Sequence, residues 1–310
     1  MTAGRPGTEP HPAGAEAATV GGPLISADDL AVALASARPP VVLDATMLLH
    51  RPRHDGDFLA ESGRARWVDA RVPGSRHVAV DADLSVPHAT HDRHPEPAEL
   101  AAKLAALGID EGTTVVAYDT VGGLWAARAW YLLDWIGVEA RVLDGGLRAW
   151  RAAGLPVASG DDAPVVRARP AWHGVAVRDA WIERAEVERA MDAGNLVCGL
   201  TEGAFDGTEP TRYSRRGHIP GSVNVPARSL SGDDGRLLAP DEVRARYVAA
   251  GVDLDREVLL YCGGGISATA NALALAHAGV RNVRVYDGSL EEWSADPSLP
   301  LATVAAVGAR

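Results

Sequence analysis

Residues 257–279 read EVLLYCGGGISATANALALAHAG. The apolar run at the start predicts a buried strand that ends at Tyr261, followed by a loop of one cysteine and three glycines. The Ala-rich segment after the loop predicts a helix from about Ser267 to Gly279, because glycine is common just beyond the end of a helix. In open α/β sheets, ligands bind at the carboxyl ends of the strands. The sequence therefore predicts a functional loop at Cys262.

The same pattern occurs earlier in the chain, at a constant spacing of 143 residues. Four pairs of residues share this spacing: Tyr118 with Tyr261, Asp144 with Asp287, Gly145 with Gly288, and Trp150 with Trp293. Upstream, VPGS at 72–75 resembles IPGS at 219–222. Short β-branched runs, such as VVLDAT at 41–46 and TTVVAYD at 113–119, alternate with longer amphipathic stretches. We therefore predict two copies of one α/β domain.

The chain length also favours two domains, because 310 residues is about twice the usual domain size of roughly 150. Residues 1–22 are rich in Gly, Pro, Ala and Thr without apolar periodicity, which predicts a disordered tail. Acidic, Gly and Pro residues interrupt the pattern at 159–174, which predicts a linker. We expect domains at 23–158 and 175–310, each with a mainly parallel sheet flanked by helices.

Charge and hydropathy exclude several classes of partner. The formal net charge is −11, and an acidic surface repels nucleic acids and anionic membranes, so we expect neither as a partner. No run approaches the ~18 uninterrupted apolar residues of a spanning helix, and the N-terminus does not resemble a signal peptide. Two cysteines are too few for a disulfide framework. We therefore expect a cytoplasmic protein.

The loop after Tyr261 concentrates groups that stabilise an anion. A helix N-terminus presents free N–H groups and a partial positive charge, and consecutive glycines let several N–H groups converge on one point. The predicted cradle for the sulfur of Cys262 consists of Gly263, Gly264, Gly265, Ile266 and Ser267. Such a cradle favours the thiolate, which is the nucleophilic form of cysteine.

Other interpretations of this loop stay open from the residues alone. Gly263, Gly265 and Ala268 fit a dinucleotide-binding fingerprint, with Asp287 as the ribose-binding acid, although Asp287 belongs to the repeated Asp-Gly turn. A cysteine phosphatase would need an arginine closing the loop around phosphate, and the residues after Cys262 supply none. Cys262 could also be a small apolar residue at an inert junction.

Several motifs resemble the tandem rhodanese and mercaptopyruvate sulfurtransferase family, from Leu24 to Leu301. They are GHIPGSVNVP at 217–226, YCGGGISATA at 261–270, VYDGSLEEW at 285–293, LDGGLRAW at 143–150 and GTEP at 207–210. The resemblance implies two rhodanese-like domains, with the nucleophile at Cys262 in the second. The paired position in the first domain is Asp119, which cannot carry sulfane sulfur, so we expect the first copy to be catalytically silent.

The resemblance implies a sulfurtransferase. The Cys262 thiolate would take sulfur from a small anionic donor of the thiosulfate or 3-mercaptopyruvate type, and the resulting persulfide would pass it to a thiol or to cyanide. The acceptor would be a thioredoxin-like protein or a low-molecular-weight thiol, and no metal or organic cofactor is required. The alternative is a sulfur carrier or regulatory binding module that serves one protein partner without turnover.

The residues expected to hold the donor depart from the family pattern. Gly263 and Gly264 stand where thiosulfate enzymes carry charge and mercaptopyruvate enzymes carry a hydroxyl, and Ala204 replaces an arginine near GTEP. In the sequence, Arg212 lies near the position of a second substrate-binding arginine of the mercaptopyruvate branch. Three further arginines are candidate anion contacts: Arg71, Arg215 and Arg216.

Cys198 is a candidate resolving thiol. It ends the predicted strand in NLVCGL, and the resemblance implies that this strand end borders the same cleft as Cys262. Attack of Cys198 on the persulfide would release sulfide and leave a disulfide, provided that the two Cα atoms lie within roughly 7 Å and the Cβ vectors converge. The other interpretation is a small apolar residue that fills a strand.

Overall fold

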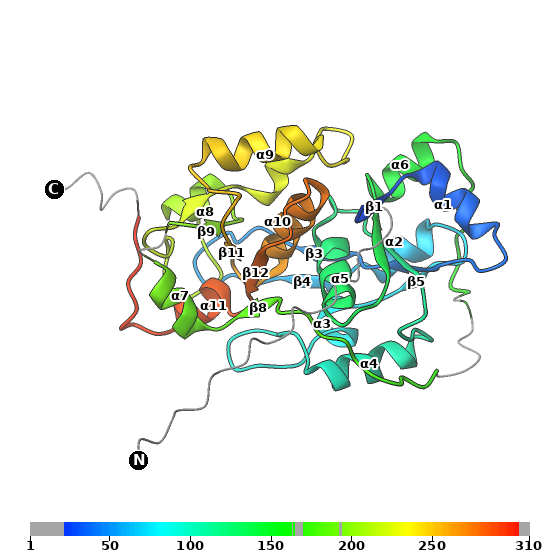
Figure 1. Ribbon diagram of the computed structural model, residues 1–310, viewed down its shortest axis with the longest axis horizontal. Coiled ribbons are helices and arrows are strands. Elements are labelled where there is room, and N and C mark those ends of the chain that lie inside the picture. Colours follow the sequence, from blue (N-terminus) through cyan, green and yellow to red (C-terminus); the bar gives the residue numbers. More distant parts are fainter. Residues whose placement is uncertain (1–21, 163, 165–169, 192–193, 304–310) are drawn as a thin grey trace, which may run out of the picture.

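Two parallel sheets of the same design form the framework of the chain (Figure 1). The computed structural model describes residues 22–162, 164, 170–191 and 194–303. The first sheet has the strand order β1-β7-β6-β2-β5, and every neighbouring pair is parallel. Its strands are β1 (Leu24–Ile25), β2 (Val41–Asp44), β5 (Arg76–His77), β6 (Val115–Tyr118) and β7 (Ala140–Leu143).

Helices and one antiparallel hairpin complete the first domain. The hairpin joins β3 (Met47–Leu49) to β4 (Ala60–Ser62). The helices are α1 (Ala27–Leu34), α2 (Arg64–Asp69), α3 (Val80–Asp83), α4 (Pro97–Ala106), α5 (Leu124–Trp135) and α6 (Gly146–Ala152).

The second sheet repeats the first in the order β10-β9-β11-β12-β8, again with parallel pairs throughout. Its strands are β8 (Trp181–Ile182), β9 (Leu196–Cys198), β10 (Val223–Asn224), β11 (Val258–Tyr261) and β12 (Val283–Tyr286). The helices are α7 (Arg184–Ala190), α8 (Glu202–Asp206), η1 (Ala227–Leu230), α9 (Pro240–Ala249), α10 (Ile266–His277) and α11 (Ser289–Trp293). The expected α/β fold with two tandem domains is confirmed.

The central strands explain why the sheets are parallel and covered on both faces. β6 reads VVAY and β11 reads VLLY, and every residue of both strands is buried. Unbroken apolar runs of this kind are typical of strands with helices on both sides. α10 begins at Ile266, one residue before the predicted start, and the repeated tryptophans Trp150 and Trp293 are both buried in the cores.

One of the buried apolar clusters contains residues of both domains. α5 and α10 pack against each other, and Figure 1 shows them side by side in the middle of the molecule. Residues of both domains, among them Tyr131 and Leu273, belong to the same buried cluster. Because α10 carries the functional loop at its N-terminus, this packing brings the first domain to the edge of the site.

The segment between β3 and β4 reaches from the first domain to the second. Asp55 Oδ1 accepts hydrogen bonds from the Thr211 N–H at 3.0 Å and from Arg216 Nε at 2.9 Å. The N–H of Gly56 donates to the carbonyl oxygen of Thr211 at 2.8 Å. This segment therefore bridges the two domains.

The predicted tail, except for Gly22, and part of the predicted linker lie outside the described residues. Near the end of the linker, Trp172 Nε1 donates to the carbonyl oxygen of Ile109 at 3.1 Å, so this part lies against the first domain. The domain boundaries at 23–158 and 175–310 stay a prediction. None of the helices in the described part of the chain has the length and apolar character needed to cross a membrane.

Candidate active site

Cys262 lines a cleft of about 750 Å³ between the two domains. It follows the last residue of β11 and precedes α10, at the carboxyl end of the sheet. The second domain contributes Tyr213 to the lining, and the first contributes His50 and Trp125. We call residues 262–265 the second loop.

Ser289 holds the second loop in place. Its Oγ accepts the N–H groups of Cys262 at 3.1 Å and Gly265 at 3.2 Å, and donates to the carbonyl oxygen of Tyr286 at 2.8 Å. Gly265 has φ +79°, and a Cβ there would lie 2.4 Å from Oδ1 of Asp287. Both the left-handed backbone and the close carboxylate therefore require glycine at this position.

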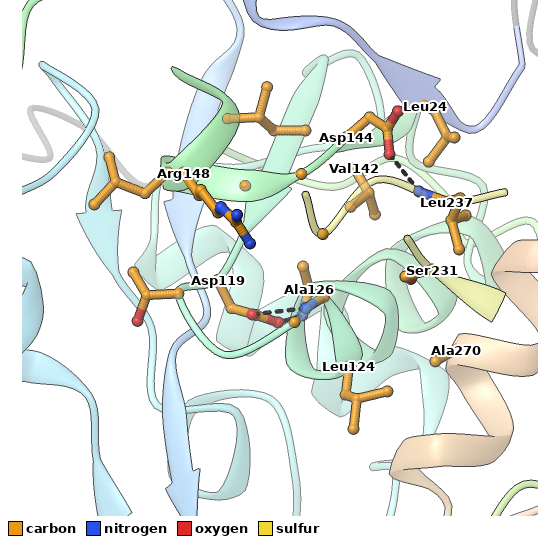
Figure 2. Close-up of a pocket in the computed structure, with 18 of the residues that line it drawn as sticks. Leu24, Asp119, Leu124, Ala126, Val142, Asp144, Arg148, Ser231, Leu237 and Ala270 are labelled. Atoms are coloured by element: carbon orange, nitrogen blue, oxygen red, sulfur yellow. Dashed lines mark hydrogen bonds between the residues drawn. The ribbon is translucent and has the colours of Figure 1, made fainter. Parts of the chain in front are cut away.

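The equivalent loop of the first domain, residues 119–123, is called the first loop. It begins with Asp119, whose buried carboxylate accepts four backbone N–H groups at its two oxygens. Figure 2 shows the bond from Ala126. Oδ1 accepts from Val121 and Gly123 at 2.8 Å, and Oδ2 accepts from Trp125 and Ala126 at 3.0 Å. The first loop is thus an anion-binding loop that its own carboxylate occupies.

The second loop keeps this scaffold without an internal anion. Gly123 and Gly265 each directly precede an α-helix. Both glycines adopt the left-handed backbone conformation, with φ of +84° and +79°. Within the part of the chain that the structure describes, five N–H groups around the second loop have no hydrogen-bond partner: those of Gly263, Gly264, Ile266, Ser267 and Ala268. These donors are available to an anionic sulfur on Cys262.

Arg212 brings a positive charge to the second loop. Its Nε donates to Glu291 Oε1 at 2.6 Å, and its Nη2 lies 3.1 and 3.2 Å from where a Cβ on Gly263 and Gly264 would be. The sequence predicted that glycines at these positions leave the loop without charge. The structure instead shows that the missing side chains leave room for a guanidinium from another segment.

Three further arginines that the sequence analysis missed line the cleft: Arg51, Arg66 and Arg228. Among the described residues, the side chains of Arg51 and Arg66 have no hydrogen-bond or ion-pair partner, whereas Arg228 donates to the carbonyl oxygen of Val121 at 3.2 Å. Arg51 and Arg66 belong to the domain predicted to be silent. No local motif reveals that their side chains line the same cleft as Cys262.

The lining of the cleft is therefore cationic. Glu209 is the one acidic residue among its described lining residues. Within the described ranges, no group of three or more His, Cys, Asp or Glu side chains is arranged to hold a metal ion. Such a surface suits small anions.

Arg71 does not line this cleft, in contrast to its predicted role as an anion contact. Its guanidinium donates to the carbonyl oxygens of Trp67, Gly160 and Asp162 and lies 4.1 Å from the ring centroid of Trp67. Arg71 therefore fastens the segment after α6 to the first domain.

Arg215 and Arg216 are also engaged away from the cleft. Arg215 donates to four backbone carbonyl oxygens, those of Trp293, Ser294, Asp296 and Leu299. Arg216 pairs with Asp55 of the bridging segment at 2.9 Å. Their donors hold the fold together, so neither occupies the donor-binding position that the sequence predicted.

Cys198 and Cys262 lie on opposite faces of the second sheet. Cys198 pairs in register with Tyr261, and successive residues of a strand point to opposite faces. Cys198 belongs to an apolar cluster with Tyr261 and Trp293, whereas Cys262 belongs to the cluster around α5 and α10. Burial raises the pKa of Cys198 to about 12. This placement argues against a resolving thiol and for a core residue.

A buried ion pair between the domains supports the second loop. Arg128 on α5 binds Asp287 through Nη1–Oδ1 at 2.6 Å and Nη2–Oδ2 at 3.2 Å. Burial by itself would raise the pKa of Asp287, but the charge and hydrogen bonds of Arg128 outweigh it and lower the pKa to about 2. The same carboxylate lies against Gly265, so the ion pair fixes the position of the loop.

The fold and this site define a family. Residues 49–153 and 183–296 each match the rhodanese-like domain family, and the chain belongs to it. Because curated relatives that match most of the chain are sulfurtransferases, the chain is a sulfurtransferase with two rhodanese-like domains.

Three curated relatives illustrate the similarity. A Pseudomonas aeruginosa protein described as a probable 3-mercaptopyruvate sulfurtransferase is 35% identical over 291 residues, which cover 90% of this chain and 98% of the relative. The 3-mercaptopyruvate sulfurtransferase of Homo sapiens is 32% identical, over 87% of this chain and 91% of its own. The mitochondrial thiosulfate/3-mercaptopyruvate sulfurtransferase 1 of Arabidopsis thaliana is 33% identical, over 72% and 64%.

Solved structures share the arrangement of both domains. The crystal structure of YnjE has a TM-score of 0.76 and 25% identity, and the match covers 91% of this chain and 68% of YnjE. A structure of EanB with ergothioneine has a TM-score of 0.73 and 21% identity, covering 91% of this chain and 70% of EanB. The latter likeness extends to the fold alone.

Proposed function

We propose that this chain moves sulfane sulfur from a small anionic donor to a thiol acceptor through a persulfide on Cys262. The observation that carries the proposal is the second loop, where five N–H groups with no partner among the described residues adjoin a cysteine in a cationic cleft. The first loop supports the assignment, because there the same scaffold holds the Asp119 carboxylate.

The reaction proceeds by double displacement. The Cys262 thiolate attacks the outer sulfur of thiosulfate or the thiol sulfur of 3-mercaptopyruvate, so a new S–S bond forms while the donor's own bond to that sulfur breaks, S–S in thiosulfate and C–S in 3-mercaptopyruvate. Thiosulfate releases sulfite, and 3-mercaptopyruvate releases pyruvate after its carbanion takes up a proton. A thiolate acceptor then attacks the outer sulfur of the persulfide, which regenerates the Cys262 thiolate.

The cradle N–H groups stabilise the persulfide as an anion while the enzyme awaits its acceptor. The cradle consists of Gly263, Gly264, Gly265, Ile266 and Ser267, although the N–H of Gly265 is shared with Ser289. Ala268 joins it, because its counterpart Ala126 donates to Asp119 in the first loop.

Arg212 is the primary contact for the donor's carboxylate or sulfonate, since its guanidinium adjoins the second loop. Arg51 and Arg66 attract the donor into the cleft, because their charges have no partner among the described residues. Glu291 orients Arg212 through its hydrogen bond to Nε and partly offsets its charge.

The acceptor is a low-molecular-weight thiol or a thioredoxin-like protein, both of which supply a thiolate at neutral pH. We place the activity in the cytoplasm, where reduced thiols are maintained as acceptors. The alternative role of a sulfur carrier without turnover is not favoured, because the relatives named above are enzymes that use small donors.

Steady-state assays with thiosulfate and with 3-mercaptopyruvate test the proposal, with cyanide or a dithiol as acceptor. We expect many turnovers per chain with one or both donors, measured as sulfite or pyruvate release. Release of at most one equivalent per chain with both donors would indicate a carrier and overturn the enzyme assignment.

The donor contact is tested by Arg212→Ala, with Arg38→Ala as a matched control at an exposed arginine outside the cleft. Loss of a charge-assisted contact of about 1.5–3 kcal/mol predicts a KM raised roughly 10- to 100-fold. Arg38→Ala should leave KM unchanged. Equal KM values in the Arg212→Ala variant and the wild type would remove Arg212 from the proposed site.

A further inference from the structure

Asp287 and Asp144 stand at equivalent positions of the internal repeat. An arginine side chain occupies the site at Asp287, whereas the site at Asp144 is open. In the occupied version, Asp287 accepts the N–H of His94 at 2.9 Å and binds Arg128. In the open version, Asp144 accepts the N–H of Leu237 at 2.9 Å through Oδ1. His94 and Leu237 each stand three residues before the proline that begins α4 and α9, so the two settings correspond residue by residue.

The side chains that fill the occupied version are large. Arg128 is the fifth residue of α5, and its guanidinium lies 5.1 Å from the ring centroid of Trp181, the first residue of β8. The imidazole of His94 stacks on Trp181 with ring centroids 4.4 Å apart. Arginine, tryptophan and histidine together leave Asp287 buried and paired.

The side chains at the equivalent positions of the open version are small. The fifth residue of α10 is Ala270, the first residue of β1 is Leu24, and Leu237 replaces His94. All three line a cavity of about 600 Å³ together with Asp144, and Figure 2 shows them around it. The cavity therefore occupies the place that Arg128 and Trp181 fill at the other carboxylate.

Asp144 keeps an unused acceptor in this cavity. No described residue donates a hydrogen bond to its Oδ2. Burial raises the pKa of Asp144, and the nearby charge of Arg236 opposes this rise, although Arg236 makes its ion pair with Asp234, at 3.9 Å. The arginines that also line the cavity include Arg148, which lies on the side of Asp119 and away from Asp144 in Figure 2. Three arginines and three aspartates are among the described residues that line the cavity: Arg66, Arg148, Arg151, Asp69, Asp119 and Asp144.

We propose that this cavity binds a guanidinium group, held by Asp144 as Arg128 is held by Asp287. A guanidinium presents paired donors to a carboxylate, and its planar face suits the apolar walls of Leu24 and Ala270. The group belongs either to a free small molecule or to an arginine side chain of a protein partner. A bound guanidinium would join the two domains, because Asp144 and Ala270 belong to different domains.

Isothermal titration calorimetry of the full chain tests the site. The probes are agmatine and L-arginine, with L-citrulline as a neutral compound of nearly the same shape. We expect saturable binding of both guanidinium compounds and at least about tenfold weaker binding of citrulline, because the charge-assisted pair is lost. A blocked peptide with one internal arginine distinguishes the sources: binding as tight as that of agmatine supports a protein side chain, and weaker binding supports a free molecule.

Variants locate the binding. Asp144→Asn should weaken binding of agmatine at least about tenfold while its Oδ1 still accepts the Leu237 N–H, and Asp69→Asn, a charge-matched control in the same cavity, should not. Ala270→Arg should fill the site, abolish agmatine binding and raise the melting temperature. Absence of agmatine and arginine binding to the wild type, or equal binding by Asp144→Asn, would overturn the proposal whether or not Ala270→Arg folds.

Discussion

The first and second loops have a similar backbone conformation but differ in the side chain at their first position. Each follows a buried tyrosine at the end of a central strand and leads into a helix through a left-handed glycine. In the first loop, the Asp119 carboxylate is an internal anion that accepts hydrogen bonds from four backbone N–H groups. In the second, Cys262 stands at the equivalent position, and the N–H groups around it have no partner among the residues that the structure describes, except those of Cys262 and Gly265, which donate to Ser289. The comparison supports the proposal that the scaffold accommodates an anion in both copies and that the side chain at its first position decides whether sulfur chemistry follows.

Replacing the proposed nucleophile, Cys262, should have the largest effect on activity. Cys262→Ser should reduce sulfur transfer to the background level, because a hydroxyl cannot form a stable sulfane adduct. Circular dichroism should show an unchanged fold, since the change is nearly isosteric. Turnover by the serine variant, measured as sulfite or pyruvate release, would remove Cys262 from the proposed mechanism.

Breaking the buried ion pair between Arg128 and Asp287 should lower stability more than the equivalent change at Asp144. Asp287→Asn leaves the Arg128 charge uncompensated, so we expect the free energy of unfolding to fall by about 3–5 kcal/mol in urea titrations. Asp144→Asn, at the half-buried equivalent, should cost less than about 1 kcal/mol. Similar losses in the two variants would contradict the contrast between the two carboxylates.

The difference in stability between the wild type and Asp287→Asn should become smaller as the pH falls. Because the pKa of Asp287 is lowered from 3.8 to about 2 in the folded chain, its ionised form stabilises the fold. That contribution is fully present above about pH 4 and is lost as the pH falls through about 2. The stability difference between wild type and Asp287→Asn should therefore shrink over this range.

The first loop should matter for stability but not for chemistry. In Asp119→Asn, the side-chain amide replaces a carboxylate oxygen that accepts two N–H groups, which should cost about 1–3 kcal/mol. The turnover number per folded chain should stay at the wild-type value. Loss of activity in a variant that remains folded would show that the first copy takes part in the reaction.

The two thiols should differ in their reactivity toward an alkylating reagent. This difference is the smallest of the predicted effects. Iodoacetamide should label Cys262 in the native chain at pH 8, whereas Cys198, with a pKa of about 12, should react only after unfolding. Peptide mapping separates the two sites. Native labelling of Cys198 at a rate equal to that of Cys262 would contradict its place in the core.

The sequence predicted the features that local patterns determine. The repeat spacing predicted both domains, which are confirmed, and the glycine loop predicted Cys262 as the nucleophile, which stays a prediction. It could not reveal that Arg212 fills the space beside Gly263, because that contact joins segments far apart in the chain. For the same reason it misassigned Arg71, whose guanidinium is taken by backbone carbonyls.

Cys198 is a different case, because strand alternation could have corrected the prediction. Its register partner is Tyr261 and not Cys262, so its side chain points to the other face of the sheet. Knowing that two strands end at the same edge was not sufficient; the register decides which side chains meet.

The central claim is that sulfur rests on Cys262 as a persulfide. Intact-protein and peptide mass spectrometry after exposure to thiosulfate or 3-mercaptopyruvate, without an acceptor, tests it most directly. We predict a gain of one sulfur atom on the peptide that contains Cys262, none on the peptide with Cys198, and loss of the gain when cyanide is added. Turnover without any sulfur gain on Cys262, or a gain confined to Cys198, would contradict the account.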